Sequence, residues 1–201
     1  MQCQNILIMR KNKLLNIAIV VCKCVKVFYI FLFIGLTSLF IHSQISPESY
    51  EEITYDSKNF KFHFNYPDST KNKNIDETKI ENTDVFSFIE ITKTSLFLNY
   101  LQFSAILIFI FLSVKEFQKI MESVKKLKTF QNNNVTSFRK IGKYIFIIFL
   151  LTSFTYTQFN ETGNFSFQTE FAPLILMLIS FIMAEIFKEG NLLQKENDLT
   201  I

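Results

Sequence analysis

Few side chains in this 201-residue sequence have the type and spacing that chemistry requires. The two histidines, His42 and His63, have no second ligand at the short spacing of a zinc site. The three cysteines, Cys3, Cys22 and Cys24, form a cluster near the start that lacks the second pair of a metal site. We therefore predict no metal and no cofactor. We interpret the cysteines as small apolar residues on the reducing side of a membrane, with a redox or metal role as the alternative.

Catalytic motifs are also missing from the sequence. The four glycines are scattered and form no phosphate-binding loop, and no serine or cysteine has the context of a nucleophile. We predict no catalytic residues and a protein that is not an enzyme. Two polar features suit transport, the stretch TSFTYT at 152–157 and Glu185. Hydrogen bonds between helices explain the first, and we expect Glu185 to form an ion pair with Lys188, Lys115 or Lys143.

The elements that position these residues are long apolar segments. Apolar residues make up 49% of the chain, with 25 phenylalanines. A helix needs about 20 mainly apolar residues to cross the hydrocarbon layer of a membrane. We predict an all-α membrane protein, a single integral membrane domain over residues 1–201. Its four transmembrane helices are expected at about 18–41, 96–114, 144–159 and 171–187.

The first span admits a second interpretation. Lys23 and Lys26 are costly at mid-bilayer but tolerable at its edge, so we place the inner boundary there. The basic start, the apolar core and the following LTSLFIHSQ also loosely fit a cleaved signal peptide. We favour a retained anchor.

Charge fixes the predicted orientation. Residues 1–26 carry a net +5 and residues 115–143 a net +6, whereas residues 42–94 carry −4 and residues 160–170 carry −2. Positively charged loops stay in the cytoplasm. We predict a multi-pass protein of the inner (cytoplasmic) cell membrane with both termini cytoplasmic, an extracytoplasmic loop at 42–94, a cytoplasmic loop at 115–143 and a cytoplasmic tail at 188–201.

The outer loop has strand periodicity. FKFHFNY at 60–66 alternates aromatic and polar residues, and 52–56 and 84–92 are also typical of strands. We expect a small antiparallel sheet, with 164–171 as a candidate cover. It is either a packed lid or a cap that senses a ligand or partner.

The inner loop has helical periodicity instead. One apolar stripe continues from the second span: Phe117, Ile120, Met121, Val124 and Leu127. Lysines, including Lys125 and Lys126, occupy the other side. This segment suits anionic headgroups, a partner's surface, or a solvated basic collar. Asparagines in QNNNVTSF are expected to cap the next helix.

The polar tail AEIFKEGNLLQKENDLTI still carries leucines. Gly190 suits the end of the last helix, although the helix can also run on to about Asn197. Leu192, Leu193 and Leu199 would then need burial, and the inner-loop stripe is the expected partner.

This ending resembles a bacterial family catalogued as domain of unknown function 2975. The resemblance rests on these tail residues: Glu185, Phe187, Glu189, Gly190, Leu193, Glu196, Asn197, Asp198, Leu199, Thr200 and Ile201. Phe130, the turn at 132–135 and FRKIG at 138–142 are similar too, so the resemblance covers most of the chain after about residue 95. It implies a four-helix integral membrane protein, often encoded beside a small helix-turn-helix regulator. It implies no activity and no catalytic residue.

These observations favour a non-enzymatic protein of the lipid bilayer that binds or regulates a cytoplasmic partner, such as a helix-turn-helix regulator. We expect no direct contact with nucleic acid, and the sequence specifies no oligomeric state. The candidate partner or structural residues lie on the inner side: Phe117, Val124, Lys125, Lys126, Glu185, Gly190, Leu193, Asp198 and Leu199. The alternative is a carrier or permease subunit that uses polar residues of the third and fourth spans.

Overall fold

The computed structural model describes the backbone of residues 2–50, 53–56, 61–64, 85–87, 91–158 and 163–199. Side chains are described from residue 13 on, except in the strands between residues 51 and 90 and at 163, 164, 166 and 198. The chain forms two compact units, which we describe separately. The first comprises Met1–Ile34, Gln102–Phe154 and Phe167–Ile201, and the second comprises Gly35–Leu101 and Thr155–Ser166.

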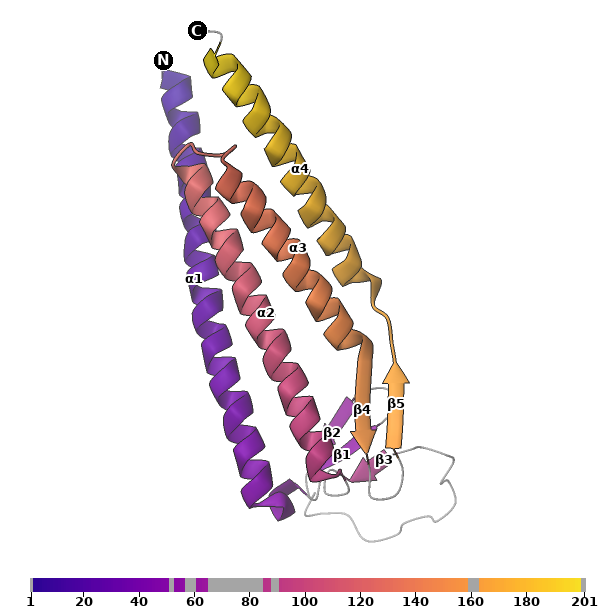
Figure 1. Ribbon diagram of the computed structural model, residues 1–201. Helices are drawn as coiled ribbons and strands as arrows, with labels where there is room; N and C mark the ends of the chain where they lie inside the picture. Colours follow the sequence, from indigo (N-terminus) through magenta and orange to yellow (C-terminus); the bar gives the residue numbers. More distant parts are fainter. Residues whose placement is uncertain are drawn as a thin grey trace, which may run out of the picture. The chain divides into compact units, whose positions relative to one another are not determined.

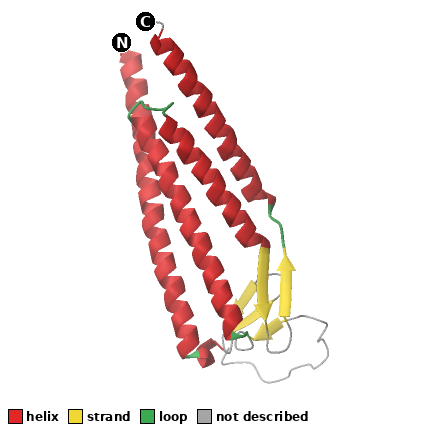
Figure 2. Ribbon diagram, viewed as in Figure 1, coloured by secondary structure: helices red, strands yellow, loops and turns green. Residues whose placement is uncertain are grey.

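Most of the described chain is helical (Figures 1 and 2). The long helices are α1 (Gln2–Ile45), α2 (Lys93–Lys125), α3 (Asn132–Ser153) and α4 (Phe171–Leu199). In the described part of the chain, three of them are long and apolar enough to cross a membrane: α1 from Lys13, α2 and α4. The chain is therefore a largely helical membrane protein. Helix α3 is not among the three, and it carries Arg139, Lys140 and Lys143 near its middle.

Helix α1 exposes most of its apolar side chains. Three successive residues, Leu32, Phe33 and Ile34, are all more than a third exposed, and their side chains point about 100° apart around the helix. A helix that is apolar all round suits a hydrocarbon environment better than water. The helix runs without interruption through Lys23 and Lys26. Whether this segment is kept as an anchor stays a prediction.

Helices α3 and α4 pack against each other in antiparallel directions. Gly142 of α3 faces the ring of Phe181, whose nearest atom lies 3.0 Å from where a Cβ at Gly142 would be. Closer to the start of α3, Arg139 forms an ion pair with Glu185, with 2.8 Å between Nη2 and Oε1. Later positions in α3 therefore contact earlier positions in α4. This register brings the end of α3 level with the start of α4.

Helix α3 ends at Ser153, so the helix predicted for the span at 144–159 is wrong at 154–158, and residue 159 lies outside the described residues. The strand β4 (Phe154–Gln158) follows directly. Its alternation of aromatic residues with threonines favours an extended backbone. The last carbonyls of a helix need partners from outside it. The side-chain amide of Gln102 in α2 donates hydrogen bonds to the carbonyl of Leu151 in the last turn and to that of Phe154, the residue after the helix.

The second unit contains two small antiparallel sheets. Strands β1 (Ile53–Asp56), β2 (Lys61–Phe64) and β3 (Val85–Ser87) pair in the order β2-β1-β3 and overlap the three segments with strand periodicity. Strand β5 (Gly163–Phe167) pairs with β4 in a separate sheet. This strand contains the first half of the segment 164–171, and its pairing with β4 does not test the predicted cover of the first sheet, which stays a prediction.

Side-chain contacts in the second unit join its helices to one another and to β4. The ring of Tyr100 in α2 stacks on Phe40 of α1, with 4.3 Å between ring centroids, and its hydroxyl lies 3.1 Å from that of Thr37. Ser95 is fully buried, and its hydroxyl bonds with the backbone of β4. His42 bonds with the hydroxyl of Tyr50, in the short 3₁₀ helix Pro47–Tyr50.

Candidate functional site

The best-packed part of the first unit is the place where α2 ends, α3 begins and α4 passes both, which we call the helix junction. Its buried core consists of Ile120, Val135, Phe138, Ile141, Ala184 and Phe187, with Met121, Val124, Ile145 and Met183 packed against it. Ile120 is only 1% exposed. The predicted continuation of the second span as an amphipathic helix is confirmed, because α2 runs on to Lys125 and buries part of its apolar stripe here.

Phe130 and Gly190 fit together at the edge of the helix junction. Phe187 contacts two rings, Phe138 at 4.9 Å and Phe130 at 5.6 Å between centroids. A Cβ at Gly190 would overlap the ring of Phe130. Gly190 lies inside α4, so its predicted role as a helix stop is wrong, and the alternative of a helix that continues to about Asn197 is confirmed. Gly190 gives Phe130 the space to pack.

The turn between α2 and α3 is closed by the buried side chain of Asn134, an arrangement we call the clasp. Its Nδ2 lies 3.0 Å from the hydroxyl of Ser123, 3.1 Å from the carbonyl of Lys128 and 2.6 Å from the carbonyl of Thr129. The expected capping of α3 by asparagines is not observed. Gln131 is the N-cap residue and makes no side-chain capping bond. Asn134 instead satisfies carbonyls of the turn.

Leu127, two residues beyond the last residue of α2, has the left-handed conformation, with a φ of 58°. The amide of Lys128 donates to the carbonyl of Ser123 at 3.0 Å, and that of Leu127 donates to Val124 at 3.1 Å. This pair of bonds is the Schellman motif, in which the left-handed position usually holds glycine. Leu127 is 83% exposed. Its predicted place on the apolar stripe is wrong, because the helix ends two residues earlier.

Charged side chains link α3 and α4 at the same level. Glu185 bonds with Arg139 at 2.8 Å and with Lys188 at 3.0 Å. The predicted pair with Lys188 is confirmed, whereas the partner from the neighbouring helix is Arg139 and not Lys115 or Lys143. These side chains are about half exposed, so the pairs contribute little to stability.

A buried carboxylate on α2 was not singled out from the sequence. Glu116 is 6% exposed, and its two oxygens bond with Lys119 at 2.6 Å and with the hydroxyl of Ser137 at 2.8 Å. The spacing of Glu116 and Lys119 on one helix face was visible in the sequence. The contact with Ser137 was not, because it depends on how α3 folds back along α2.

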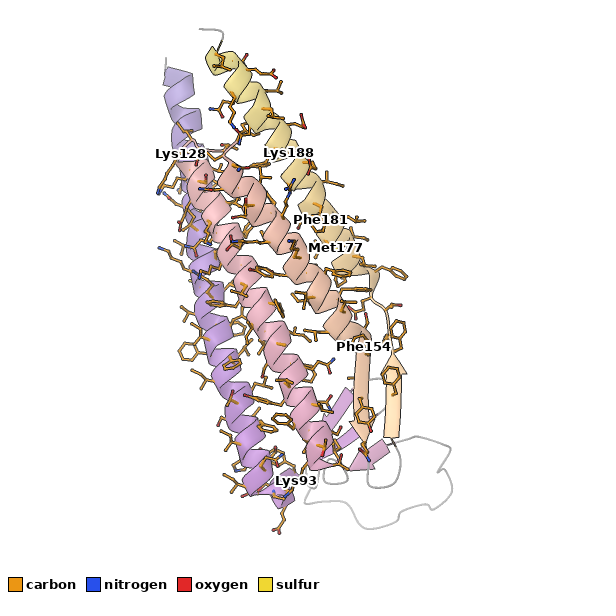
Figure 3. The ribbon with its side chains drawn as sticks, viewed as in Figure 1. Lys93, Lys128, Phe154, Met177, Phe181 and Lys188 are labelled. Atoms are coloured by element: carbon orange, nitrogen blue, oxygen red, sulfur yellow. The ribbon has the colours of Figure 1, made fainter. Side chains whose placement is uncertain are left out.

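The far end of α4 has exposed leucines. Leu192, Leu193 and Leu199 are 46%, 61% and 87% exposed. The prediction that they pack on the stripe of α2 is therefore wrong. Asp198 belongs to the helix, but its side chain lies outside the described residues. An apolar groove of about 720 Å³ runs along this side of α4, from Phe181 to Leu193, with Phe130 on its other wall (Phe181 is labelled in Figure 3).

A family comparison covers the same region. The profile of DUF2975, described as a protein of unknown function, matches residues 63–201. The chain belongs to the DUF2975 family. Comparisons with curated proteins and with solved structures give no match. The matched part of this DUF2975 protein includes α2, α3 and α4, and therefore the whole helix junction.

Two hydroxyls of the polar stretch at 152–157 of the DUF2975 protein bond within their own helix, not between helices as expected. Thr152 and Ser153 donate to carbonyls of their own helix, at 3.0 Å and 2.7 Å. Thr155 and Thr157 belong to β4. The hydroxyls therefore contribute to the end of one helix and to a strand.

The remaining predicted residues lie on the flanks of the helix junction. Phe117 is 42% exposed and lines a small apolar hollow with Cys22 of α1. Cys22 is buried among apolar neighbours, and Cys24 is exposed. Lys125 and Lys126 are exposed at the end of α2. Within the described residues, no group of three or more His, Cys, Asp and Glu side chains comes together.

Proposed function

We propose that this DUF2975 protein crosses the inner (cytoplasmic) membrane four times as a single integral membrane domain, with both termini in the cytoplasm. The strand-bearing loop at 42–94 then lies outside, and the helix junction lies at the cytoplasmic surface. The alternation of basic and acidic segments supports this orientation. The antiparallel packing of α3 on α4, one of the helices that can cross a membrane, supports a fourth crossing.

The proposed role is non-enzymatic, namely the binding of a cytoplasmic protein by the exposed apolar side of α4. The exposure of Leu193 and Leu199 carries this proposal. Leu193 lies six residues beyond Phe187, roughly 9 Å further along the helix, and Leu199 roughly 18 Å. Both are outside the hydrocarbon layer. Leu193 lies on the groove side of α4, and Leu199 points about 120° away from it around the helix. Exposed leucines on a helix in water are unfavourable unless another surface covers them.

The part of the groove beyond Phe187, which reaches Glu189, Gly190 and Leu193, favours an amphipathic helix as the binding element. Its walls are almost entirely apolar, and Glu185 and Glu189 stand at its rim. A partner helix with an apolar stripe and flanking basic residues would match both features. A helix-turn-helix regulator has helices of this kind. The regulator would contact DNA, and the membrane protein would bind no nucleic acid itself.

Site-specific photo-crosslinking in living cells tests the proposal. A photoreactive amino acid at Leu193 is expected to capture one cytoplasmic protein, and Leu193→Glu is expected to reduce binding of that protein at least tenfold. The matched control places the same amino acid at Lys195, about 200° around the helix. Equal capture at both positions, or labelling of Leu193 by a membrane-impermeant reagent outside intact cells, would contradict the proposal.

The alternative is a carrier that uses the polar residues of α3 and Glu185. Such a carrier needs these groups to be free for a substrate. Thr152 and Ser153 donate to their own helix, and Glu185 is engaged with Arg139 and Lys188. These contacts favour the binding role.

A further inference from the structure

A polar pocket of about 500 Å³ lies between the last turns of α2 and the first turns of α3. Four lysines and two glutamates line it. The lysines come from α2 (Lys119), from the turn (Lys126 and Lys128) and from α3 (Lys140). We propose that this pocket binds the phosphate group of an anionic phospholipid headgroup. The site is separate from the groove on α4 and does not depend on a protein partner.

The floor of the pocket is a fixed polar surface. It includes Asn134, Ser137 and Glu116, whose exposed fractions are 2%, 6% and 6%. Asn134 is held by the clasp, and the hydroxyl of Ser137 donates to Glu116 at 2.8 Å. Buried polar groups that are hydrogen-bonded in this way hold a fixed arrangement. The pocket therefore exists before a ligand arrives.

The charges of the pocket favour an anion. Both carboxylates already have donors, since Glu116 accepts from Lys119 and Ser137, and Glu122 accepts from the amide of Gln118 at 2.6 Å. The other three lysines of the pocket have no carboxylate within 4.0 Å among the described residues: Lys126, Lys128 and Lys140. Three ammonium groups around one cavity are suited to the several oxygens of a phosphate.

The start of α3 adds backbone donors to the same pocket. Gln131, Asn133 and Asn134 line it, and Gln131 makes no side-chain capping bond. The amide of Asn134 donates to the carbonyl of Gln131 at 2.9 Å, so the donors offered here are the amides before it, at the end of the helix that carries a partial positive charge. Phosphate oxygens bind at such positions. The lysines and the helix start thus act on one ligand.

The depth of the pocket favours a lipid over a soluble anion. The uncharged run of α2 ends at Val114, and Lys119 lies five residues further, roughly 7–8 Å along the helix. The polar layer of a bilayer extends roughly 5–7 Å beyond the hydrocarbon. On α3, Lys140 follows Arg139, which pairs with Glu185 at the end of the uncharged run of α4. Lys119 and Lys140 are therefore level with headgroup phosphates. Lys126 lies twelve residues beyond Val114, roughly 18 Å along α2, so the pocket extends from the headgroup layer toward the cytoplasm. Basic pockets between helices at this surface bind anionic lipids.

Two charge-matched triple variants of the full chain test the proposal. The pocket variant is Lys126→Gln, Lys128→Gln and Lys140→Gln. The control variant is Lys115→Gln, Lys125→Gln and Lys143→Gln, which removes the same charge from exposed positions outside the pocket lining. Each purified protein is titrated with phosphatidylglycerol, phosphatidylcholine and inorganic phosphate, and binding is measured by native mass spectrometry and thermal unfolding.

Phosphatidylglycerol is expected to bind the unaltered protein at least tenfold more tightly than phosphatidylcholine. The pocket variant should lose at least tenfold in that affinity and the control variant less than threefold. Replacing the same three pocket lysines by arginine should preserve binding, which separates loss of charge from loss of folding. Equal losses in pocket and control variants, or loss of binding in the arginine variant, would overturn the site. Inorganic phosphate that stabilises the protein as much as phosphatidylglycerol would overturn the lipid source.

Discussion

The helix junction and the tail of α4 use similar residues in opposite environments. Phe187 is 9% exposed, and Leu193, six residues later on the same helix, is 61% exposed. The difference comes from the neighbours. Helix α2 ends at Lys125 and α3 begins at Asn132, so α4 has both beside it as far as Gly190 and extends beyond them after that. Apolar residues on one helix thus serve two purposes, internal packing and an exposed surface for another molecule.

The largest expected effect distinguishes these two environments directly. Ile120→Ala removes buried atoms from the core of the helix junction and should cost about 2–4 kcal/mol of unfolding free energy, because the cavity does not fully close. Leu193→Ala removes exposed atoms and should change it by no more than about 0.5 kcal/mol. Thermal or denaturant unfolding in detergent micelles measures both. Equal destabilisation by the two substitutions would mean that the tail is packed after all.

Gly190→Ala is expected to have the next largest effect, at the border between the two regions. The new Cβ would overlap the ring of Phe130, and such overpacking typically costs about 1–3 kcal/mol. The same unfolding experiment should show that Phe130→Leu in the Gly190→Ala background recovers part of the loss, a coupling expected of two side chains in contact. A Gly190→Ala variant as stable as the unaltered protein would rule out the close contact.

The smallest effect has the opposite sign. Leu127→Gly should stabilise the protein by about 0.5–1 kcal/mol, because a left-handed residue with a side chain is strained and glycine is not. The comparison variant is Lys125→Gly, which places glycine in the last turn of α2 and should destabilise by about 0.5–1 kcal/mol. If both substitutions destabilise equally, the left-handed end of α2 is not under strain.

Local patterns in the sequence predicted much of this arrangement. The period of the stripe through Ile120 and Val124 gave the continuation of α2, and the spacing of Glu185 and Lys188 gave their pair. Both depend only on the geometry of one helix. The family was also recognisable from its tail. These features needed no knowledge of which helices are neighbours.

Most of the errors involve contacts between elements, whereas the early end of α2 before Leu127 is a local one. Glycine is a residue type that often ends helices, but Gly190 lies inside α4 and accommodates the ring of Phe130, which is 60 positions earlier in the sequence. Arg139 pairs with Glu185 because of the register of α3 on α4, which the sequence of either helix does not specify. The end of α3 at Ser153 depends partly on donors from Gln102. Burial of the tail was predicted from its leucines alone, without a neighbour of sufficient length.

The clasp has a consequence for how the protein is made. All of its bonds join residues between Ser123 and Asn134, so the turn that orders α2 and α3 needs no residue of α4. The two helices can enter the membrane as a finished hairpin, with Phe130 already placed at its tip. Helix α4 then packs last, and its Gly190 leaves the space that the ring of Phe130 occupies.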